Sequence, residues 1–389
     1  MTLRSAQARV ADSYRQLLRW LLEDACPLWS TCGVDSIRGG FEEMLEGSRV
    51  VAAPRRVRVQ PRQIAAFSQA SRLGWRGDVE AMVRLGLDAL RMRYRRDDGL
   101  YRGLVAPDGA VLDDRALLYD QAFVLLGFAE SQKVFGAAAR AEVADAARAL
   151  RALLRCYFKR EGPGFESAAQ PPLPPLSSNA HMHLLEASLA SYEADGDPEW
   201  LALADEIGEL ALTRFIDSTT GAVREHFTPT WDPLPGIPGR VLEPGHHFEW
   251  AWLLLRWAGA HRADARDAAF RLIDLGERHG VHAGVAINAL LDDFSVHDAS
   301  ARLWPQTERI KAAALAARAT GEAQYWISAA DAAASLWRYL QTPTRGSWHD
   351  RLMPDGQFIE EPAPASSFYH IVGAIAELGA LLNEGHGGK

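Results

Sequence analysis

Residues 244–255, PGHHFEWAWLLL, decide the fold. They lead from the end of a loop into an apolar helix, and a polar residue, which we call a landmark, stands at the junction. Pro244 and Gly245 end a loop, His246 follows at once, and the run from Phe248 to Leu255 is almost entirely apolar. A helix that is apolar on every side belongs in a protein interior. The stretch therefore predicts an inner helix whose first turn carries polar chemistry.

The same arrangement recurs along the chain at a steady interval. The other landmarks are Arg62 in QPRQIAAFSQA, Asp120 and Gln121 in YDQAFVLLGFA, His183 in NAHMHLLEA, Glu308 in RLWPQTERIKAA and His370 in SFYHIVGAIAEL. Along the series 62, 120, 183, 246, 308 and 370, the successive differences are 58, 63, 63, 62 and 62 residues. Each interval leaves room for a second, amphipathic helix such as AEVADAARALRALLRCYF, so the period predicts stacked helical hairpins.

Six such hairpins predict a closed, all-α ring, with six inner helices around a centre and six outer helices facing water. In this ring the landmark segments converge at one end, whereas an open solenoid would spread them along a groove. Strand signals are few, and short pieces such as GGFEEML and GAVREHF are expected to form hairpins in loops. We expect residues 1–389 to form a single catalytic domain.

The composition of the chain indicates which kinds of partner and which cellular compartment to expect. A formal net charge of −8 argues against nucleic acid and against anionic membrane surfaces. No unbroken run of 18 apolar residues predicts a membrane span, and the N-terminal stretch lacks the pattern of a signal peptide. The three cysteines Cys26, Cys32 and Cys156 form neither a disulfide framework nor a CxxC pair. We therefore expect a cytoplasmic protein, either monomer or homodimer.

Two histidines lie three residues before a glutamate, a spacing that places both side chains on one helix face. They are His183 with Glu186, and His246 with Glu249. The neighbours His181 and His247 point elsewhere, since His181 is two positions from His183, or roughly 200° around a helix, and His247 is one position from His246, or roughly 100°. His183 and His246 are thus the members expected to face the centre.

Three histidines around one pocket, with Arg62 opposite them, suit proton transfer beside a sugar carbonyl. A neutral histidine held by a carboxylate is a base poised near neutral pH. One histidine would remove the proton from C2 of an aldose, Arg62 would stabilise the enediol oxygens, and a second histidine would return the proton. Return to C1 gives a ketose, and return to C2 from the other face gives the 2-epimer.

The remaining candidate residues are expected to contact the sugar. Trp304 offers a face for stacking on sugar C–H groups, and Asn179 belongs to the His183 motif. Glu308 either binds a sugar hydroxyl or caps an arginine. Asp120 and Gln121 either bind substrate or tie inner helices together.

The segments RVRVQPRQIAAFS, YDQAF, NAHMHLLEA, EPGHHFEWAWLL, RLWPQTE and YHI, in this order, resemble the N-acylglucosamine 2-epimerase family, and most of all its bacterial mannose isomerases. The resemblance runs from Gly39 to His370 and implies an (α/α)6 barrel. It implies that Arg62 is essential, that His246 and His370 handle the proton, and that Glu249 orients His246. It assigns His183 a supporting or substrate-binding part.

The resulting hypothesis is an isomerase that interconverts a free hexose, such as D-mannose, with D-fructose through a cis-enediol. The main alternative is a 2-epimerase acting on N-acetylglucosamine and N-acetylmannosamine or on a free hexose. The low lysine content and the lack of a basic cluster favour a free sugar over a phosphorylated one.

Three further classes fit less well. A metal enzyme would need ligands on one face, yet Glu243 and His246 are separated by Pro244 and Gly245 and no HExxH motif occurs. A glycoside hydrolase could use Asp120 and Glu308, but would leave the histidines unexplained. A helical scaffold would not gather polar residues at inner helix starts. We expect neither a metal nor a cofactor: the resemblance implies that no metal is needed, and the lack of a phosphate-binding glycine loop argues against a nucleotide.

Overall fold

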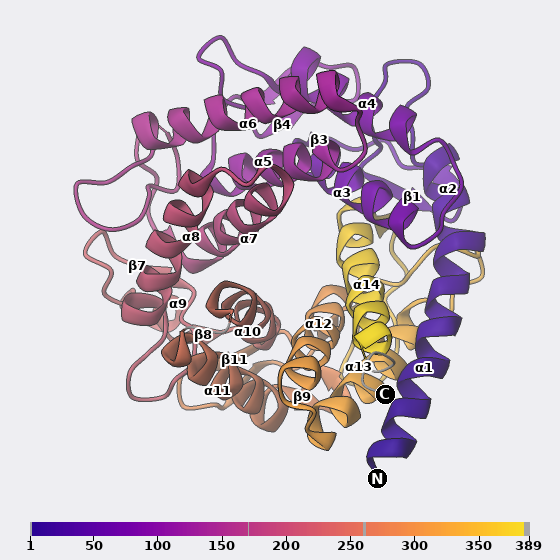
Figure 1. Ribbon diagram of the computed structural model, residues 1–389, viewed down its shortest axis with the longest axis vertical. Coiled ribbons are helices and arrows are strands. Elements are labelled where there is room, and N and C mark those ends of the chain that lie inside the picture. The colour runs from indigo at the N-terminus through magenta and orange to yellow at the C-terminus, as the bar shows by residue number, and fades with distance from the viewer. Residues whose placement is uncertain (1, 170, 260–261, 385–389) are drawn as a thin grey trace.

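The computed structural model describes residues 2–169, 171–259 and 262–384, and these form two concentric rings of helices (Figure 1). The predicted all-α, closed ring of six hairpins, the (α/α)6 barrel, is confirmed. The inner helices are α3 (Val59–Arg72), α5 (Leu118–Gln132), α7 (Ser178–Asp195), α10 (Pro244–Ala258), α12 (Leu303–Thr320) and α14 (Phe368–Glu384). The outer helices are α1 (Leu3–Trp20), α4 (Val79–Ala89), α6 (Ala137–Tyr157), α8 (Pro198–Leu210), α11 (Ala263–His279) and α13 (Ala323–Tyr339).

The two rings differ in how much of each helix is buried. In α5 every residue except Tyr119 is buried, whereas α6 buries one stripe made of Ala144, Ala147, Leu150 and Leu154. A helix buried on all sides must be apolar or have its polar groups paired, while a surface helix needs one apolar face. The apolar runs that follow the landmarks therefore form the helices of the inner ring.

Side chains at the starts of five inner helices fasten the loops that precede them. In each case a side-chain atom accepts the backbone N–H of a loop residue at 2.8–3.1 Å. The pairs are Gln60 with Phe41, Gln121 with Tyr101, His181 with Phe165, His247 with Val223, and Gln306 with Ala286. We call these five contacts the loop clamps. Buried backbone N–H groups need a partner, and the clamps supply it.

The strands of the described chain are two or three residues long and pair antiparallel in the loops. The three-stranded sheets are β15 (Ala363–Pro364), β1 (Met44–Glu46) and β2 (Arg49–Val50); β3 (Arg55–Arg56), β4 (Leu104–Val105) and β5 (Val111–Asp113); and β12 (Val296–Asp298), β11 (Ala289–Leu291) and β8 (Val241–Leu242). The pairs are β6 (Leu176–Ser177) with β7 (His226–Phe227), β9 (Val281–His282) with β10 (Val285–Ala286), and β13 (Ala301–Arg302) with β14 (Arg351–Leu352).

The ring closes where its first and last hairpins meet. Leu45 of β1 pairs with Ala363 of β15, and α1 packs against both α13 and α14, as Figure 1 shows. Below this join Trp29 stacks on Trp348 with ring centroids 4.6 Å apart, and Trp348 stacks on Phe368 at 5.9 Å. Aromatic burial of this kind joins the two ends of the chain into one core.

One segment of the described chain, Ala365–Asn383, is long and apolar enough to cross a membrane by length and composition alone. It overlaps α14, an inner helix, from Phe368 to Asn383, and 67% of its most apolar window is buried. Burial in the ring accounts for its composition. Glu377 interrupts the apolar sequence of this segment, so it is not an unbroken apolar run.

We predict that Gln121→Leu lowers the free energy of unfolding by about 1–3 kcal/mol for each backbone group it leaves unpaired. Gln121 bonds both the N–H and the C=O of Tyr101, and leucine of similar size can bond neither. Urea denaturation measures the change. The exposed Gln324→Leu serves as control, and equal effects of the two substitutions would contradict a stabilising role for the clamp.

Candidate active site

A cavity of about 270 Å³ lies at the end of the inner ring where the landmark turns converge. Its wall comes from the first turns of the inner helices and from the loops before them. The lining residues are Arg56, Arg58, Arg62, Tyr119, Asn179, His183, Glu243, His246, Glu249, Arg302, Trp304, Ser366 and His370. Seven of the ten residues singled out from the sequence line this cavity.

The other three predicted residues lie behind the wall. Gln121 is committed to its loop clamp, which fits the structural alternative of its two expected roles, although the side chain ties a loop and not another inner helix. Asp120 is fully buried and pairs with Arg58 at 2.9 Å, so its contact with the cavity passes through that arginine. Glu308 is also fully buried, and its partners are His370 and Lys311 rather than a sugar hydroxyl.

Each cavity histidine bonds a buried carboxylate through Nδ1. His183 bonds Glu186 at 3.1 Å, His246 bonds Glu225 at 2.9 Å, and His370 bonds Glu308 at 2.8 Å. No described residue bonds Nε2 of these rings, so Nε2 is the nitrogen available to a bound molecule. The face argument for His183 over His181, and for His246 over His247, agrees with these positions, because His181 and His247 serve as loop clamps.

The expected role of Glu249 is wrong in one respect, because it does not hydrogen-bond His246. Its closest imidazole contact is His183 Nδ1, 3.9 Å from Glu249 Oε1. The ring of His246, in the first turn of α10, turns instead toward the loop that carries Glu225 and toward Glu243, whose Oε2 lies 3.6 Å away. Glu225 precedes His246 by 21 residues in a loop, so helix spacing could not identify it.

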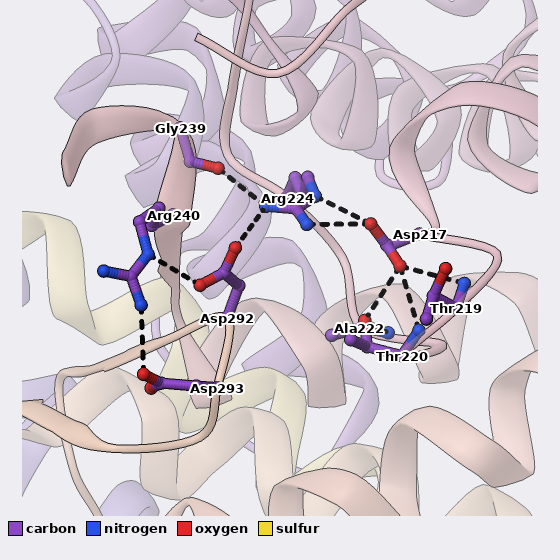
Figure 2. Close-up of polar contacts among 9 residues, drawn as sticks. All are labelled: Asp217, Thr219, Thr220, Ala222, Arg224, Gly239, Arg240, Asp292 and Asp293. Atoms are coloured by element: carbon purple, nitrogen blue, oxygen red, sulfur yellow. Dashed lines mark hydrogen bonds and ion pairs between the residues drawn. The ribbon is translucent and has the colours of Figure 1, made fainter. Parts of the chain in front are cut away.

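Ion pairs on both sides fix the segment that carries Glu225 (Figure 2). Arg224 donates to Asp217 at 2.8 and 3.0 Å and to Asp292 at 3.2 Å. Asp292 also accepts from Arg240 at 2.8 Å, and Asp217 accepts the backbone N–H of Thr220 at 2.9 Å. Bidentate arginine contacts are geometrically selective. The network therefore keeps Glu225 in position to hydrogen-bond His246.

The three histidines differ in charge because their surroundings differ. Burial lowers the pKa of His183 to about 4. Burial, Arg62 and Lys311 lower the pKa of His370 well below its usual value. Burial acts the same way on His246, but Glu225 and Glu243 outweigh it and raise the pKa of His246 to about 10. At neutral pH the cavity thus holds one imidazolium and two neutral imidazoles.

Arg62 is the cation best placed to meet negative charge in the cavity. It is 6% exposed and has no carboxylate partner among the described residues. Its NH2 donates to Tyr119 Oη at 2.7 Å, and its guanidinium lies 4.0 Å from the centre of the Phe123 ring. Trp304 faces two histidines, with centroid distances of 5.0 Å to His246 and 6.0 Å to His370.

Carboxylates and imidazoles in the described residues also form three groups with ligand atoms within 4.8 Å of one another. They are His183, Glu186 and Glu249; Glu225, Glu243 and His246; and Glu249, Glu308 and His370. A metal bound at Nδ1 would have to displace the hydrogen bond that each histidine makes there. The absence of a metal stays a prediction from the sequence.

Comparison with known proteins identifies one family, related sugar isomerases and a solved structure with the same fold. A family model described as N-acylglucosamine 2-epimerase matches residues 39–374. Mannose-6-phosphate isomerase of Rhizobium meliloti (strain 1021) is 46% identical over 372 residues, covering 93% of this chain and 96% of that protein. D-mannose isomerase of Thermobifida fusca is 31% identical over 305 residues, covering 70% and 72%. A crystal structure of D-mannose isomerase shares the fold with a TM-score of 0.85 at 23% identity, covering 94% and 97%.

We predict that His246 stays protonated at pH 8 while His183 and His370 are neutral, and that Glu225→Gln lowers the pKa of His246. The substitution removes the strongest charge that opposes burial. NMR titration of histidine-labelled protein measures both, with the exposed Glu322→Gln as control. Ordinary titration of His246 near pH 6.5 in the unmodified protein would contradict this electrostatic picture.

Proposed function

The chain belongs to the N-acylglucosamine 2-epimerase family and is an isomerase, and on that premise we propose that it interconverts D-mannose and D-fructose. The observation that carries the proposal is the set of Nδ1-bonded histidines around Arg62 in one cavity. Relatives named D-mannose isomerase support the choice of sugar.

In the forward direction, neutral His370 is the base that removes the C2 proton through Nε2. Its Nδ1–H donates to Glu308, which steadies the imidazolium that forms. Negative charge develops on O1 of the aldose, where Arg62 stabilises it. His246, an imidazolium at neutral pH, gives O1 a proton, and the product of this half-reaction is the enediol.

The second half-reaction restores both histidines. His246, now neutral, removes the proton from O2 as the C2 carbonyl forms, and His370 gives its proton to C1. The product is the ketose, and both groups regain their starting charge. If His246, still an imidazolium, instead gave its proton to C2 of the enediolate from the opposite face, the O1 carbonyl would re-form and the product would be the 2-epimer, which is the alternative function. Exchange with solvent would then return a proton to His246 and remove one from His370.

The charges around the cavity favour an uncharged sugar. Arg56 pairs with Glu43, Arg58 with Asp120 at 2.9 Å, and Arg302 with Asp350 at 3.3 Å. Arg62 therefore remains as the one cavity arginine without a carboxylate in the described chain, and it matches a single developing charge. Among the described residues, a phosphate dianion would find no second cavity arginine free of a carboxylate partner.

A phosphorylated hexose is the second candidate, because the 46% identical relative is named mannose-6-phosphate isomerase. The half-exposed Arg302 and the partly exposed Arg56 are the groups that would receive the phosphate. Comparison of kcat/KM for D-mannose and D-mannose 6-phosphate separates the two candidates.

We predict that D-mannose incubated with the protein in D2O yields D-fructose carrying deuterium at C1, read by NMR. The C2 proton must pass through a histidine that exchanges with solvent, although direct return of the same proton reduces the label. Deuterium at C2 with inverted configuration would indicate the epimerase instead. Lack of product and of exchange with both mannose and its 6-phosphate would contradict the proposal.

We predict that His246→Gln and His370→Gln each lower kcat by roughly 10²–10⁴-fold, the usual contribution of a general acid or base. His181→Gln is the matched control, because glutamine fills the equivalent clamp position in three other hairpins. It should retain near-normal kcat and the helical circular dichroism spectrum. Near-normal activity of either cavity variant would remove that histidine from the mechanism.

A further inference from the structure

A lysine buried beneath the cavity has no part in the reaction scheme above. Lys311 lies one turn after Glu308 on α12 and is 2% exposed. Its Nζ is 2.6 Å from Glu308 Oε2 and 3.7 Å from the centre of the Trp252 ring. Burying an ammonium group is costly unless it is paired, so this position calls for a specific partner.

The partner, Glu308, bonds in two directions. Its Oε2 meets Lys311, and its Oε1 accepts from His370 Nδ1 at 2.8 Å. One carboxylate thus joins a buried cation to the histidine that acts as the base. The sequence contains the signal for this contact, since Glu308 and Lys311 have the same three-residue spacing as His183 and Glu186.

The groups around Glu308 make its ionisation sensitive to Lys311. Glu186 of α7 and Glu249 of α10 lie in the same buried layer, while His370 and Tyr369 approach from α14. Arg62 of α3 and His183 of α7 face the layer from the cavity. Tyr369 donates its hydroxyl proton to Glu186 at 2.6 Å. Burial raises the pKa of Glu308, and Lys311 is the group that opposes this most.

We propose that Lys311 is a positioning residue that keeps Glu308 ionised and thereby fixes the proton of His370 on Nδ1. Nε2 of His370 then carries the lone pair that faces the sugar. The inference rests on the proposed function, because it assigns the base of that reaction its tautomer.

Loss of the lysine charge has a defined chemical consequence. Glu308 would take up a proton, since it is fully buried beside two other carboxylates. Its hydroxyl would then donate to His370 Nδ1, and the imidazole proton would move to Nε2. The base would present an N–H to the sugar instead of a lone pair. A wrong tautomer of this kind is known to disable histidine bases elsewhere.

The test is Lys311→Met, with Lys133→Met as the matched control. Lys133 follows the last residue of α5, pairs with Glu130 at 2.7 Å and lines the same pocket as Lys311, but it contacts no cavity histidine among the described residues. We expect Lys311→Met to lower kcat for D-mannose by roughly 10²-fold or more at pH 7 with a small change in KM. We also expect kcat to recover as pH rises, because Glu308 ionises again. A purely structural role would lower kcat equally at every pH.

A double substitution sharpens the test. In a Glu308→Gln background the carboxylate that joins Lys311 to His370 is gone, so adding Lys311→Met should lower kcat no further. Additive losses, or a Lys311→Met profile parallel to that of the unmodified protein, would overturn the proposal.

A readout without substrate separates this proposal from the proposed function. Ring ¹⁵N shifts of His370, assigned with His370→Gln, report its tautomer directly. Nδ1–H in the unmodified protein and Nε2–H in Lys311→Met support the positioning role, even if no sugar reacts. An unchanged tautomer in Lys311→Met would overturn it while leaving the isomerase proposal intact.

Discussion

The cavity depends on one repeated interaction, an imidazole Nδ1 bonded to a buried carboxylate. His183, His246 and His370 all make it, at 3.1, 2.9 and 2.8 Å. In these three rings the contact fixes the ring orientation and the tautomer. With it, Nε2 of each ring is left for the sugar. Burial lowers the pKa of all three rings; Arg62 and Lys311 add to this effect at His370, whereas Glu225 and Glu243 outweigh it at His246.

The polar residues at the start of an inner helix have two different roles in the ring of hairpins. Residues such as Gln121, His181 and His247 clamp loops, and His183 and His246 face the cavity. Neighbouring residues on one helix therefore stabilise the fold and carry the chemistry separately. This division explains why some histidines in the motifs lie outside the cavity.

The period of the landmarks predicted the closed ring, and helix-face spacing predicted which histidine of each pair faces inward. Both predictions rest on local geometry that a helix imposes on any sequence. Spacing also predicted Glu186 as the partner of His183, but it did not predict the partners of His246 and His370. Glu225 reaches His246 from a loop, and Glu308 reaches His370 from another inner helix, so only tertiary structure brings them together. The expected hydrogen bond between Glu249 and His246 does not form, because the His246 side chain points toward the loop that carries Glu225.

The most direct test of the account is a crystal structure with D-mannitol, an open-chain analogue that cannot isomerise. The account predicts that its C1 and C2 lie within about 3–3.5 Å of Nε2 of His370, with the C1 and C2 hydroxyls near His246 and Arg62. A polyol bound outside this cavity, or a metal ion bound between the histidines and their carboxylates, would contradict it.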